Sequence, residues 1–380
     1  MFSCTPEKNT AAIPVVKILF EDKIQWDKKL TCSIVYQNDG QLDSLSAKIK
    51  YRGGLSSRYD KHSYRLELDD PFPMGDLPIE DDWILNATYI DKTFIRHKLN
   101  YDLFRAMNPE NVAAKSTFIE LYKNQDYKGL YLLQQKITAK LVGLDKQDSL
   151  AALFKDPPIF YQEPFTVADS LNPFEQKFPK LTKRNLTYRM ELLADFLNNS
   201  SDSTFLADVW KYFDKDNILD WHLLLLFSNN EDGLVKNFYL YQRRTNEPYR
   251  IAIWDYDHTF GRDGDNEMNF FERFIDVRRA NLFDRLIALD ADYIPAVAER
   301  WKELRLKGII SFEGITEMIE DYNNQIADYI AKNQAVWPID EKWYFDNSDY
   351  WMELDLMRSF IQIQILRLDK AFGWVGMEMN

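Results

Sequence analysis

Two polar clusters stand among apolar and aromatic residues in the second half of the chain: EDGLVKN at 231–237 and WDYDHTFG at 254–261. They contain Asp232, Asn237 and Asp255, each next to a stretch expected to form a buried element. Burying a carboxylate without a partner is costly, so carboxylates beside Leu, Ile and Trp indicate a compensating group. Carboxylate and amide oxygens are ligands that suit Mg²⁺. The pattern therefore favours one charged site built from two distant loops.

The spacing of these residues indicates which chemistry they could perform. Asn237 follows Asp232 by five residues, and Asp255 comes 18 residues later at the end of a predicted strand. A protein kinase has its catalytic aspartate, asparagine and metal-binding aspartate in this order. In phosphoryl transfer one carboxylate orients the attacking hydroxyl and accepts its proton, while the amide and the second carboxylate hold the divalent cation. Because a D-x-x-x-x-N match is common by chance, the trio needs support from the elements around it.

The elements that position these residues change character along the chain. Up to residue 138, short alternating runs separated by turn residues predict strands and one helix. From residue 139 onward helical periodicity dominates, interrupted by the proline-containing segment 156–180, which we expect to be a long ordered loop. Strands are predicted at 14–20, 30–36, 45–51, 63–68, 116–122, 127–137, 238–242 and 249–254, and helices at 92–107, 186–199, 203–213, 218–227, 280–289, 294–305, 312–333 and 352–372.

The order of these elements supports the phosphoryl-transfer interpretation. In kinases a phosphate-covering loop, a strand lysine, a helix, two strands and a hinge precede the catalytic loop, and this chain supplies each in turn. The glycine- and serine-bearing RGGLSSR at 52–58 would cover the phosphates, and Lys61 or Arg65 would contact them. The strand YLLQQKI, 131–137, would lead into the hinge.

At this level of detail the chain resembles a known family. The stretches YRGGLSSRYDKHSYRLEL, WILNATYIDKTFIRHKLNYDLF, FIELYKNQDYKGLYLLQQKI, KNFYLY and YRIAIWDYDHTFG are similar, in order, to the motifs of the CotH family, the spore-coat protein H kinases. The resemblance runs from about residue 45 to 262 and more loosely to about 373. It implies an atypical, secreted or surface-associated protein kinase that uses ATP and Mg²⁺ or Mn²⁺ to phosphorylate Ser or Thr of a protein partner.

The resemblance also assigns residues. Asp232 matches the catalytic aspartate of the family, and Asn237 and Asp255 match its metal-binding positions, with Asp257 as a further ligand candidate. Arg96 and Asn124 match motif positions without an assigned role. The residues expected on the nucleotide side are Arg52, Ser56, Ser57, Arg58, Lys61, Arg65 and Gln135.

The chain also departs from the family pattern. Gln135 stands where the family usually has Glu, and Thr138 stands where it has Asp. The predicted helix 92–107 lacks a glutamate for a kinase-type Lys–Glu pair, and Glu231 precedes Asp232 where the usual loop has arginine. An alternative is therefore a catalytically weak or inactive kinase-like protein that acts in surface binding or adhesion. A third alternative is phosphorylation of a small molecule or glycan.

The composition indicates which kinds of partner and which cellular compartment to expect. The 380 residues carry 47 basic and 60 acidic side chains, a formal charge of −13, which argues against a nucleic-acid surface. No apolar run approaches the roughly 20 residues that span a bilayer. Cys4, in MFSCTPEKN, looks like the end of a lipoprotein signal, so we expect an extracytoplasmic protein, lipid-anchored at the bacterial cell envelope. The sequence as given shows no working export signal, and membrane contact would come only through that anchor.

The expected fold is α+β, a two-lobed atypical protein-kinase-like fold with nucleotide between the lobes. Residues 1–12 would be a tether, 13–138 a small β-rich N-lobe, and 139–376 a larger, mainly helical C-lobe carrying the catalytic and metal loops. The four histidines show no metal-ligand pair at i, i+4; His222 is expected to be a satisfied core residue, and His258 is expected near the site. The stretch DGDNE at 263–267 lacks the spacing of a calcium loop and is expected to be solvated.

Overall fold

The structure is a computed structural model that describes residues 12–161, 174–262, 274–338 and 346–374. Cys4, most of the predicted tether and the DGDNE stretch lie outside the described residues. The chain forms two compact units, each built from separate stretches. Unit 1 comprises Met1–Ile95, Lys115–Lys136 and Glu317–Tyr350; unit 2 comprises Arg96–Ala114, Ile137–Thr316 and Trp351–Asn380. These units do not coincide with the predicted lobes 13–138 and 139–376, because Arg96–Ala114 groups with unit 2 and Glu317–Tyr350 with unit 1.

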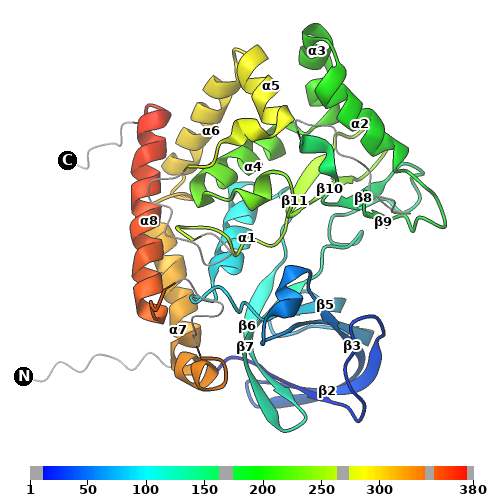
Figure 1. The fold of residues 1–380 in the computed structure, drawn as a ribbon, viewed down its shortest axis with the longest axis vertical. Coiled ribbons are helices and arrows are strands. Elements are labelled where there is room, and N and C mark those ends of the chain that lie inside the picture. Colours follow the sequence, from blue (N-terminus) through cyan, green and yellow to red (C-terminus); the bar gives the residue numbers. More distant parts are fainter. Residues whose placement is uncertain (1–11, 162–173, 263–273, 339–345, 375–380) are drawn as a thin grey trace, which may run out of the picture. The chain divides into compact units, whose positions relative to one another are not determined.

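Unit 1 contains a closed seven-stranded β-barrel with strand order β1-β2-β3-β4-β5-β7-β6 (Figure 1). The expectation of a small strand-rich lobe is corrected in this respect, because a closed barrel has no free edge strand. The ring closes where β1 pairs in parallel with β6, with Val15 opposite Glu120. The strands are β1 (Val15–Leu19), β2 (Leu30–Asn38), β3 (Gln41–Arg52), β4 (Ser63–Phe72), β5 (Glu80–Asn86), β6 (Ser116–Lys123) and β7 (Asp126–Gln135).

The barrel interior follows from the period-2 alternation of its strands. In β4, Tyr64, Leu66 and Leu68 are buried in the apolar cluster, whereas Arg65 and Glu67 between them are half-buried on the other face. The same alternation places Val16 and Ile18 of β1 and Leu121 of β6 inside, each with no exposed surface. Burial of this one face fixes the strand register, because a slip by one residue would turn every apolar side chain outward.

A helix from the C-terminal part of the chain packs on the barrel. It is α7 (Phe312–Val336), which belongs to unit 1 from Glu317 onward. Asn333 Oδ1 accepts the N–H of Leu130 in β7 at 3.0 Å, and Trp337 Nε1 donates to the carbonyl of Lys128 at 2.9 Å. Gly129 lies directly beneath this contact with φ of 102°, and a Cβ there would lie 2.4 Å from Asn333 Oδ1. The helix of unit 1 is therefore α7 and not the predicted helix 92–107.

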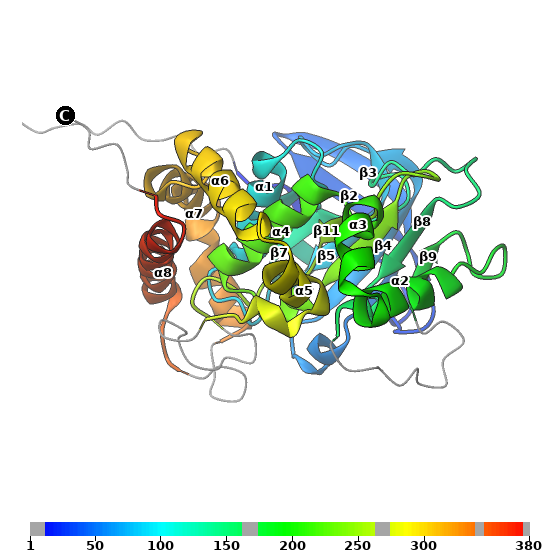
Figure 2. The ribbon, with the colours of Figure 1, turned by 90° about the horizontal axis from the view of Figure 1, so that it is seen from above.

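Unit 2 combines a four-stranded sheet, in the order β11-β10-β8-β9, with helices. Helix α4 is buried along nearly its whole length, and it contacts α1, α6 and β11 (Figures 1 and 2). The sheet strands are β8 (Ala152–Lys155), β9 (Gln176–Phe178), β10 (Phe238–Gln242) and β11 (Arg250–Ile253). The helices are α1 (Arg96–Met107), α2 (Tyr188–Asn199), α3 (Asp202–Tyr212), α4 (Lys215–Ser228), α5 (Asn281–Leu289), α6 (Tyr293–Leu306) and α8 (Tyr350–Ala371).

Two elements differ from the sequence prediction in ways that have local causes. The predicted helix 92–107 begins only at Arg96, because Asp91 Oδ1 accepts the N–H and hydroxyl of Thr93 in a turn and Phe94 is left-handed (φ 64°). The predicted loop 156–180 contains the short strand β9 and the buried 3₁₀ turn Pro158–Phe160, and its residues 162–173 lie outside the described residues.

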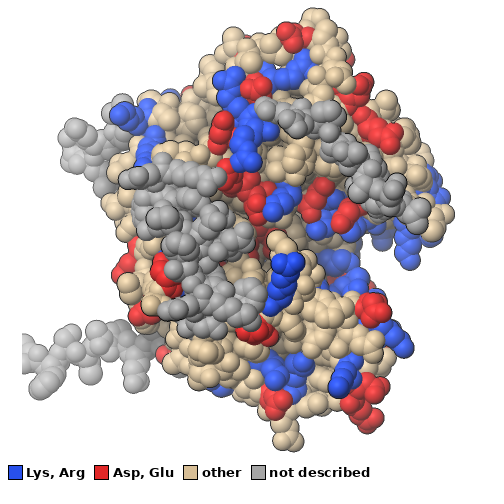
Figure 3. Space-filling view, in the orientation of Figure 1, with Lys and Arg blue, Asp and Glu red and all other residues tan. Residues whose placement is uncertain are grey.

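The surface matches the mixed charge of the composition. On the face shown in Figure 3, acidic and basic side chains are interspersed. Among the described residues, no helix combines the length and apolar character needed to cross a membrane.

Candidate functional site

Asp232 lies in the short loop between α4 and β10. Helix α4 ends at Ser228 and is capped by Asn229, whose left-handed backbone (φ 55°) lets its N–H bond to carbonyls of the last turn. Asn230 Oδ1 then accepts the N–H of Gly233 at 2.9 Å, next to the 3₁₀ turn Asp232–Leu234. A side chain at Gly233 would collide with Asn230, because an added Cβ would lie 2.6 Å from Asn230 Nδ2. Local polar contacts of this loop therefore set the position of Asp232.

The second polar loop is joined directly to the first. Asn237 and Asp255 both have left-handed backbones, with φ of 62° and 60°, which Asn and Asp tolerate better than most residues. Asn237 Nδ2 donates to the carbonyl of Asp255 at 3.2 Å, and Trp254 N–H donates to the carbonyl of Asn237 at 3.0 Å. Backbone in this region is strained and persists where surrounding contacts hold it, as in many functional sites. The structure thus brings the two predicted loops side by side.

Asp232 has two basic neighbours. Lys236 Nζ lies 3.0 Å from Asp232 Oδ2, and His258 Nδ1 lies 3.4 Å from the same oxygen. Partial burial lowers the pKa of Lys236, but its hydrogen bond to Asp232 and the attraction of that carboxylate outweigh burial and raise the pKa overall. Lys236 therefore carries a full positive charge beside the predicted catalytic carboxylate.

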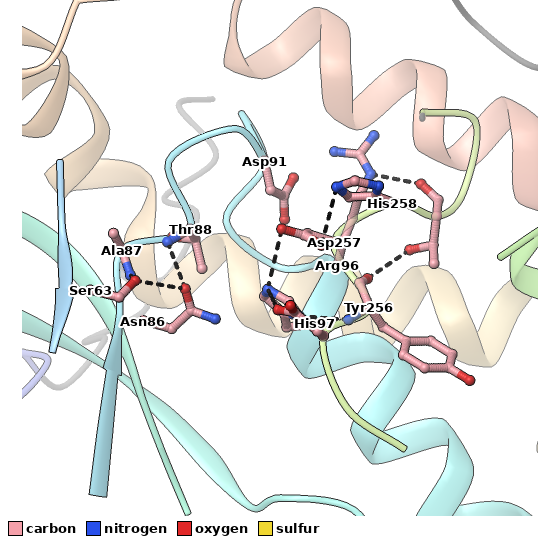
Figure 4. A network of polar contacts seen from close by, with 12 residues as sticks. Ser63, Asn86, Ala87, Thr88, Asp91, Arg96, His97, Tyr256, Asp257 and His258 are labelled. Carbon is pink, nitrogen blue, oxygen red and sulfur yellow. Dashed lines mark hydrogen bonds and ion pairs between the residues drawn. The ribbon is translucent and has the colours of Figure 1, made fainter. Parts of the chain in front are cut away.

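Asp257 lies between two histidines, as Figure 4 shows. Its Oδ1 is 3.6 Å from His258 Nε2, and its Oδ2 is 3.7 Å from His97 Nε2. His97 Nε2 is also 3.9 Å from Asp255 Oδ1. Acidic and basic side chains therefore alternate from Asp232 through His258, Asp257 and His97 to Asp255.

The ligand atoms of this cluster are of types that bind divalent cations. One ligand atom from each of His97, Asp255 and Asp257 can be chosen so that all three lie within 4.8 Å of one another. Asp255 keeps 45% of its side chain exposed and Asp257 keeps 19%, so solvent reaches both carboxylates. Their hard oxygens, together with the amide of Asn237, suit Mg²⁺ or Mn²⁺.

Helix α1 holds the loop that carries the two aspartates. Tyr101 Oη accepts the N–H of Asp255 at 3.1 Å, and His97 Nδ1 accepts the N–H of Tyr256 at 3.0 Å. Asn100 Nδ2 donates to Thr259 Oγ1 at 3.0 Å. These contacts come from successive turns of one buried helix face, so α1 fixes the backbone of the loop at several points.

Arg96, whose role the sequence left open, anchors the same loop. Its Nε donates to the carbonyl of Thr259 at 2.9 Å, and its Nη2 lies 3.3 Å from Glu353 Oε2. Arg262 pairs with the same glutamate. Both Arg96 and Glu353 have 1% of their side chains exposed. The buried ion pair therefore connects the loop to α8.

Sequence reasoning placed Asp232, Asn237, Asp255, Asp257 and His258 near one another, and the structure gathers them. The sequence analysis missed His97 and Tyr101, and it did not single out Lys236. A signal for the first two was present, because α1 buries a polar stripe at positions i, i+1, i+4 and i+5 starting from Arg96. A polar stripe on a buried helix face indicates a partner that accepts and donates hydrogen bonds.

Lys61 is placed differently from its prediction as a phosphate contact. It is 1% exposed, and its ammonium group donates to the carbonyl of Ala87 at 2.9 Å, to Asn333 Oδ1 at 3.2 Å and to the carbonyl of Leu130. Burial lowers its pKa well below the usual value. An ammonium has three donors, and all three are used within unit 1, so this placement gives Lys61 a structural role.

Arg65 and Gln135 are also engaged with protein groups. Arg65 pairs with Asp82 at 2.8 Å and with Glu67 at 3.3 Å on the outer face of the barrel. Gln135 is 2% exposed; its Nε2 donates to Glu80 Oε1 at 3.3 Å and its Oε1 accepts the N–H of Lys115 at 3.0 Å. Neither placement supports the nucleotide contact predicted for the side chain.

The glycine- and serine-bearing loop remains exposed or half-buried between β3 and β4. It forms the 3₁₀ turn Leu55–Arg58, in which no residue is buried. Ser57 Oγ donates to the carbonyl of Gly54 at 2.7 Å. Gly53 has φ of 141°, and a Cβ there would lie 2.6 Å from Ser56 Oγ. This loop, with Arg52 at its start, is the part of the predicted nucleotide side that presents surface.

Asn124 has a local role in unit 1. It is left-handed (φ 54°) in the turn between β6 and β7, and its Oδ1 accepts the N–H of Phe20 at 3.1 Å. The residue that matched a family motif without a role therefore shapes a turn of the barrel.

The comparisons with known proteins agree with the sequence resemblance. The profile of the family described as "CotH kinase protein" matches residues 49–363. The chain therefore belongs to the CotH kinase protein family. Among characterised proteins it is similar to the inner spore coat protein H of Bacillus subtilis (strain 168), with 27% identity over 278 residues, which is 67% of this chain and 71% of that protein.

A solved structure is also similar at a low level. The proinflammatory kinase CtkA of Helicobacter pylori aligns over 84% of this chain and 100% of that chain, with 8% sequence identity and a TM-score of 0.26. A TM-score this low supports no conclusion about fold or activity.

Proposed function

We propose that the protein is an atypical protein kinase that transfers the γ-phosphoryl group of ATP to Ser or Thr of a protein partner, with Mg²⁺, or Mn²⁺ in its place. The observation that carries this proposal is the cluster in which His258 lies 3.4 Å from Asp232 and 3.6 Å from Asp257. The predicted catalytic carboxylate and a predicted metal ligand therefore share one neighbour, although they are 25 residues apart in the chain. Family membership supports the same reaction class.

Each residue of the cluster has a proposed part in the reaction. Asp232 orients the acceptor hydroxyl and takes its proton, while Lys236 and His258 hold that carboxylate in place. Asn237, Asp255 and Asp257 would hold the cation, which when bound neutralises charge on the nucleotide phosphates. The helix α1 contacts keep the backbone of Asp255 fixed before substrate arrives.

On the nucleotide side, the proposal rests on Arg52, Ser56, Ser57 and Arg58. Their loop presents surface in unit 1 and contains two basic side chains and two hydroxyl groups. Guanidinium groups and hydroxyls are common donors to phosphate oxygens.

Replacement of the two aspartates tests the mechanism. Because loss of general-base and metal-binding groups removes transition-state stabilisation, we expect Asp232→Asn and Asp255→Asn to lower phosphoryl transfer by about 10²- to 10⁴-fold. The measurement is incorporation of label from γ-labelled ATP into the chain itself and into a panel of protein, glycan and small-molecule acceptors. Asp208→Asn on α3, where the carboxylate pairs with Lys211, is the matched control and should retain full activity. Incorporation unaffected by either change would reject the mechanism.

A second candidate function is binding or adhesion on a kinase-like scaffold without turnover. The engagement of Lys61 with protein carbonyls and of Gln135 with Glu80 favours it, because these side chains are then not offered to a nucleotide. If this candidate is correct, nucleotide and metal binding by calorimetry will be absent, or present without label transfer to any acceptor.

We also propose an extracytoplasmic location at the cell envelope, with a lipid on Cys4 as the anchor. The similarity to a spore coat protein supports a location outside the cytoplasm. Labelling of cells with an alkyne fatty acid should mark the native chain and not the Cys4→Ser variant. Unlabelled native chain would remove the anchor from the proposal and leave the phosphotransferase mechanism untouched.

A further inference from the structure

His97 completes a group of ligand-type atoms that could bind metal in two different ways. With Asp255 and Asp257 it offers one imidazole nitrogen and two carboxylate oxygens within 4.8 Å of one another. Either the imidazole nitrogen ligates the cation, or it stands behind the carboxylates and orients them. The two roles require the ring proton on different nitrogens, because only an unprotonated nitrogen has a lone pair for a metal.

The backbone determines which nitrogen carries the proton. His97 Nδ1 lies 3.0 Å from the backbone nitrogen of Tyr256, whose N–H points at it and can only donate. Nδ1 must therefore present its lone pair. A neutral imidazole with an unprotonated Nδ1 carries its proton on Nε2.

The protonated nitrogen is the one that faces the aspartates. Nε2 lies 3.7 Å from Asp257 Oδ2 and 3.9 Å from Asp255 Oδ1. The Nε2–H group of His97 therefore faces both carboxylates from less than 4 Å. At this distance the N–H dipole attracts the negative charge of each carboxylate. Figure 4 shows the His97 ring and Asp257 directed toward one another.

The ring has little freedom to turn over, a movement that would put a carbon in the place of each nitrogen. His97 has 1% of its side chain exposed, and its ring stacks on Tyr101 with a centroid separation of 5.9 Å and an interplanar angle of 27°. Tyr101 in turn accepts the N–H of Asp255. A ring flip would lose the bond to Tyr256 and place a C–H group toward its N–H.

We propose that His97 is a positioning residue held in the Nε2–H tautomer, which orients Asp255 and Asp257 and does not ligate the cation. The proposal rests on the proposed function only in assigning the two aspartates to a cation. It implies a site made of oxygen ligands, which would favour Mg²⁺ and Mn²⁺ and bind Zn²⁺ without the added affinity of an imidazole.

Imidazole ¹⁵N NMR of the full chain tests the tautomer directly. In protein labelled with ¹⁵N-histidine, the His97 signals are those lost in His97→Gln and retained in His222→Gln. We expect an unprotonated-type shift for Nδ1 and a protonated-type shift for Nε2, unchanged on addition of Mg²⁺. The reversed pattern, two protonated nitrogens, or an exchange of the pattern on addition of Mg²⁺ would overturn the proposal.

A pair of substitutions tests the positioning role without relying on kinase activity. His97→Gln can keep an N–H donor near the place of Nε2, whereas His97→Ala keeps none. Removal of such an orienting partner costs about 10- to 100-fold in metal affinity. We therefore expect His97→Ala to weaken Mn²⁺ binding, followed by paramagnetic resonance, by this factor and His97→Gln to restore most of it. Thermal melts identify any variant that fails to fold.

The metal preference distinguishes an orienting residue from a metal ligand. If His97 orients oxygen ligands, the ratio of Zn²⁺ to Mg²⁺ affinity is the same in the native chain and in His97→Gln. A ratio that falls at least tenfold in His97→Gln would identify His97 as a ligand and overturn the proposal. A protein that shows the expected tautomer but transfers no phosphate would reject the kinase function alone, so the two failures are distinguishable.

Discussion

His222 illustrates what the interior of unit 2 does to an ionisable side chain. The ring is 1% exposed, its Nδ1 lies 2.8 Å from the hydroxyl of Tyr293, and the two rings stack with centroids 5.6 Å apart. Burial lowers its pKa to about 3. The sequence prediction of a satisfied core histidine is confirmed. His97 and His258 differ from it because carboxylates surround them, so the environment and not the residue type separates structural from site histidines.

This burial predicts a pH dependence of stability. The unfolded chain binds a proton at His222 below about pH 6.5, whereas the folded chain does so only near pH 3, so the free energy of unfolding falls as the pH decreases through this window. Between pH 7.5 and 4.5 the loss from this residue should be about 2 to 3 kcal/mol. His222→Gln, which keeps an amide near Tyr293, should lose that part of the dependence in urea titrations. An equal dependence in both proteins would contradict the assignment.

At the scale of elements, two helices make polar contacts that their hydrophobic periodicity does not reveal. Helix α1 presents a buried polar stripe to the loop of the aspartates, with Asn100 and Tyr101 bonded to it. Helix α7 docks on the barrel through Asn333, which accepts the N–H of Leu130. In both cases a few polar contacts, and not an apolar stripe alone, set the position of the helix.

Gly129 tests how closely α7 approaches the barrel. Gly129→Ala would place a Cβ 2.4 Å from Asn333 Oδ1 at a left-handed position (φ 102°), so both strain and overlap destabilise the variant. We expect a loss of roughly 2 to 5 kcal/mol in the free energy of unfolding. Gly40→Ala is the matched control, because Gly40 is also left-handed (φ 78°) but has nothing within 4 Å of the added Cβ. It should cost about 1 to 2 kcal/mol. Equal losses for the two variants would argue against the close approach.

At the scale of the whole molecule, the chain builds unit 1 from its two ends. The barrel strands come from residues before 137, while the helix that covers Leu130 and Lys61 comes from Glu317–Tyr350. Phe118 of β6 also packs against Tyr322 of that segment, with ring centroids 6.3 Å apart. Unit 1 is therefore complete only when Glu317–Tyr350, near the C-terminal end of the sequence, has been added.

This arrangement predicts that the barrel sequence alone is not a stable domain. A fragment of residues 12–138 lacks the acceptor that Asn333 gives to Lys61, and it exposes apolar surface such as Phe118. We expect it to bind a hydrophobic dye and to unfold without a cooperative transition when urea titration is followed by circular dichroism. The full chain is the control. A cooperative transition of the fragment at the midpoint of the full chain would contradict the prediction.

Much of the local structure could be predicted from the sequence. Except for β5 (Glu80–Asn86), which was not predicted, the strands of the barrel and most helices lie where alternation and helical spacing predicted them. Strand β10 spans Phe238–Gln242, the same residues as its prediction. The short strands β8 and β9 were not predicted, because four and three residues are too few to show a period. The start of α1 was misplaced, because the turn at Asp91 competes with the helix.

The sequence by itself determined the type of most elements and the polar loops between them, because periodicity and turn chemistry act over a few neighbouring residues. Only the tertiary structure decided which distant residues meet. It closed the barrel through β1 and β6, buried the Lys61 ammonium under Asn333, and brought His97 to Asp255, 158 residues away in the chain. Such contacts depend on how whole elements pack against one another, and the pattern within each element does not encode its partner.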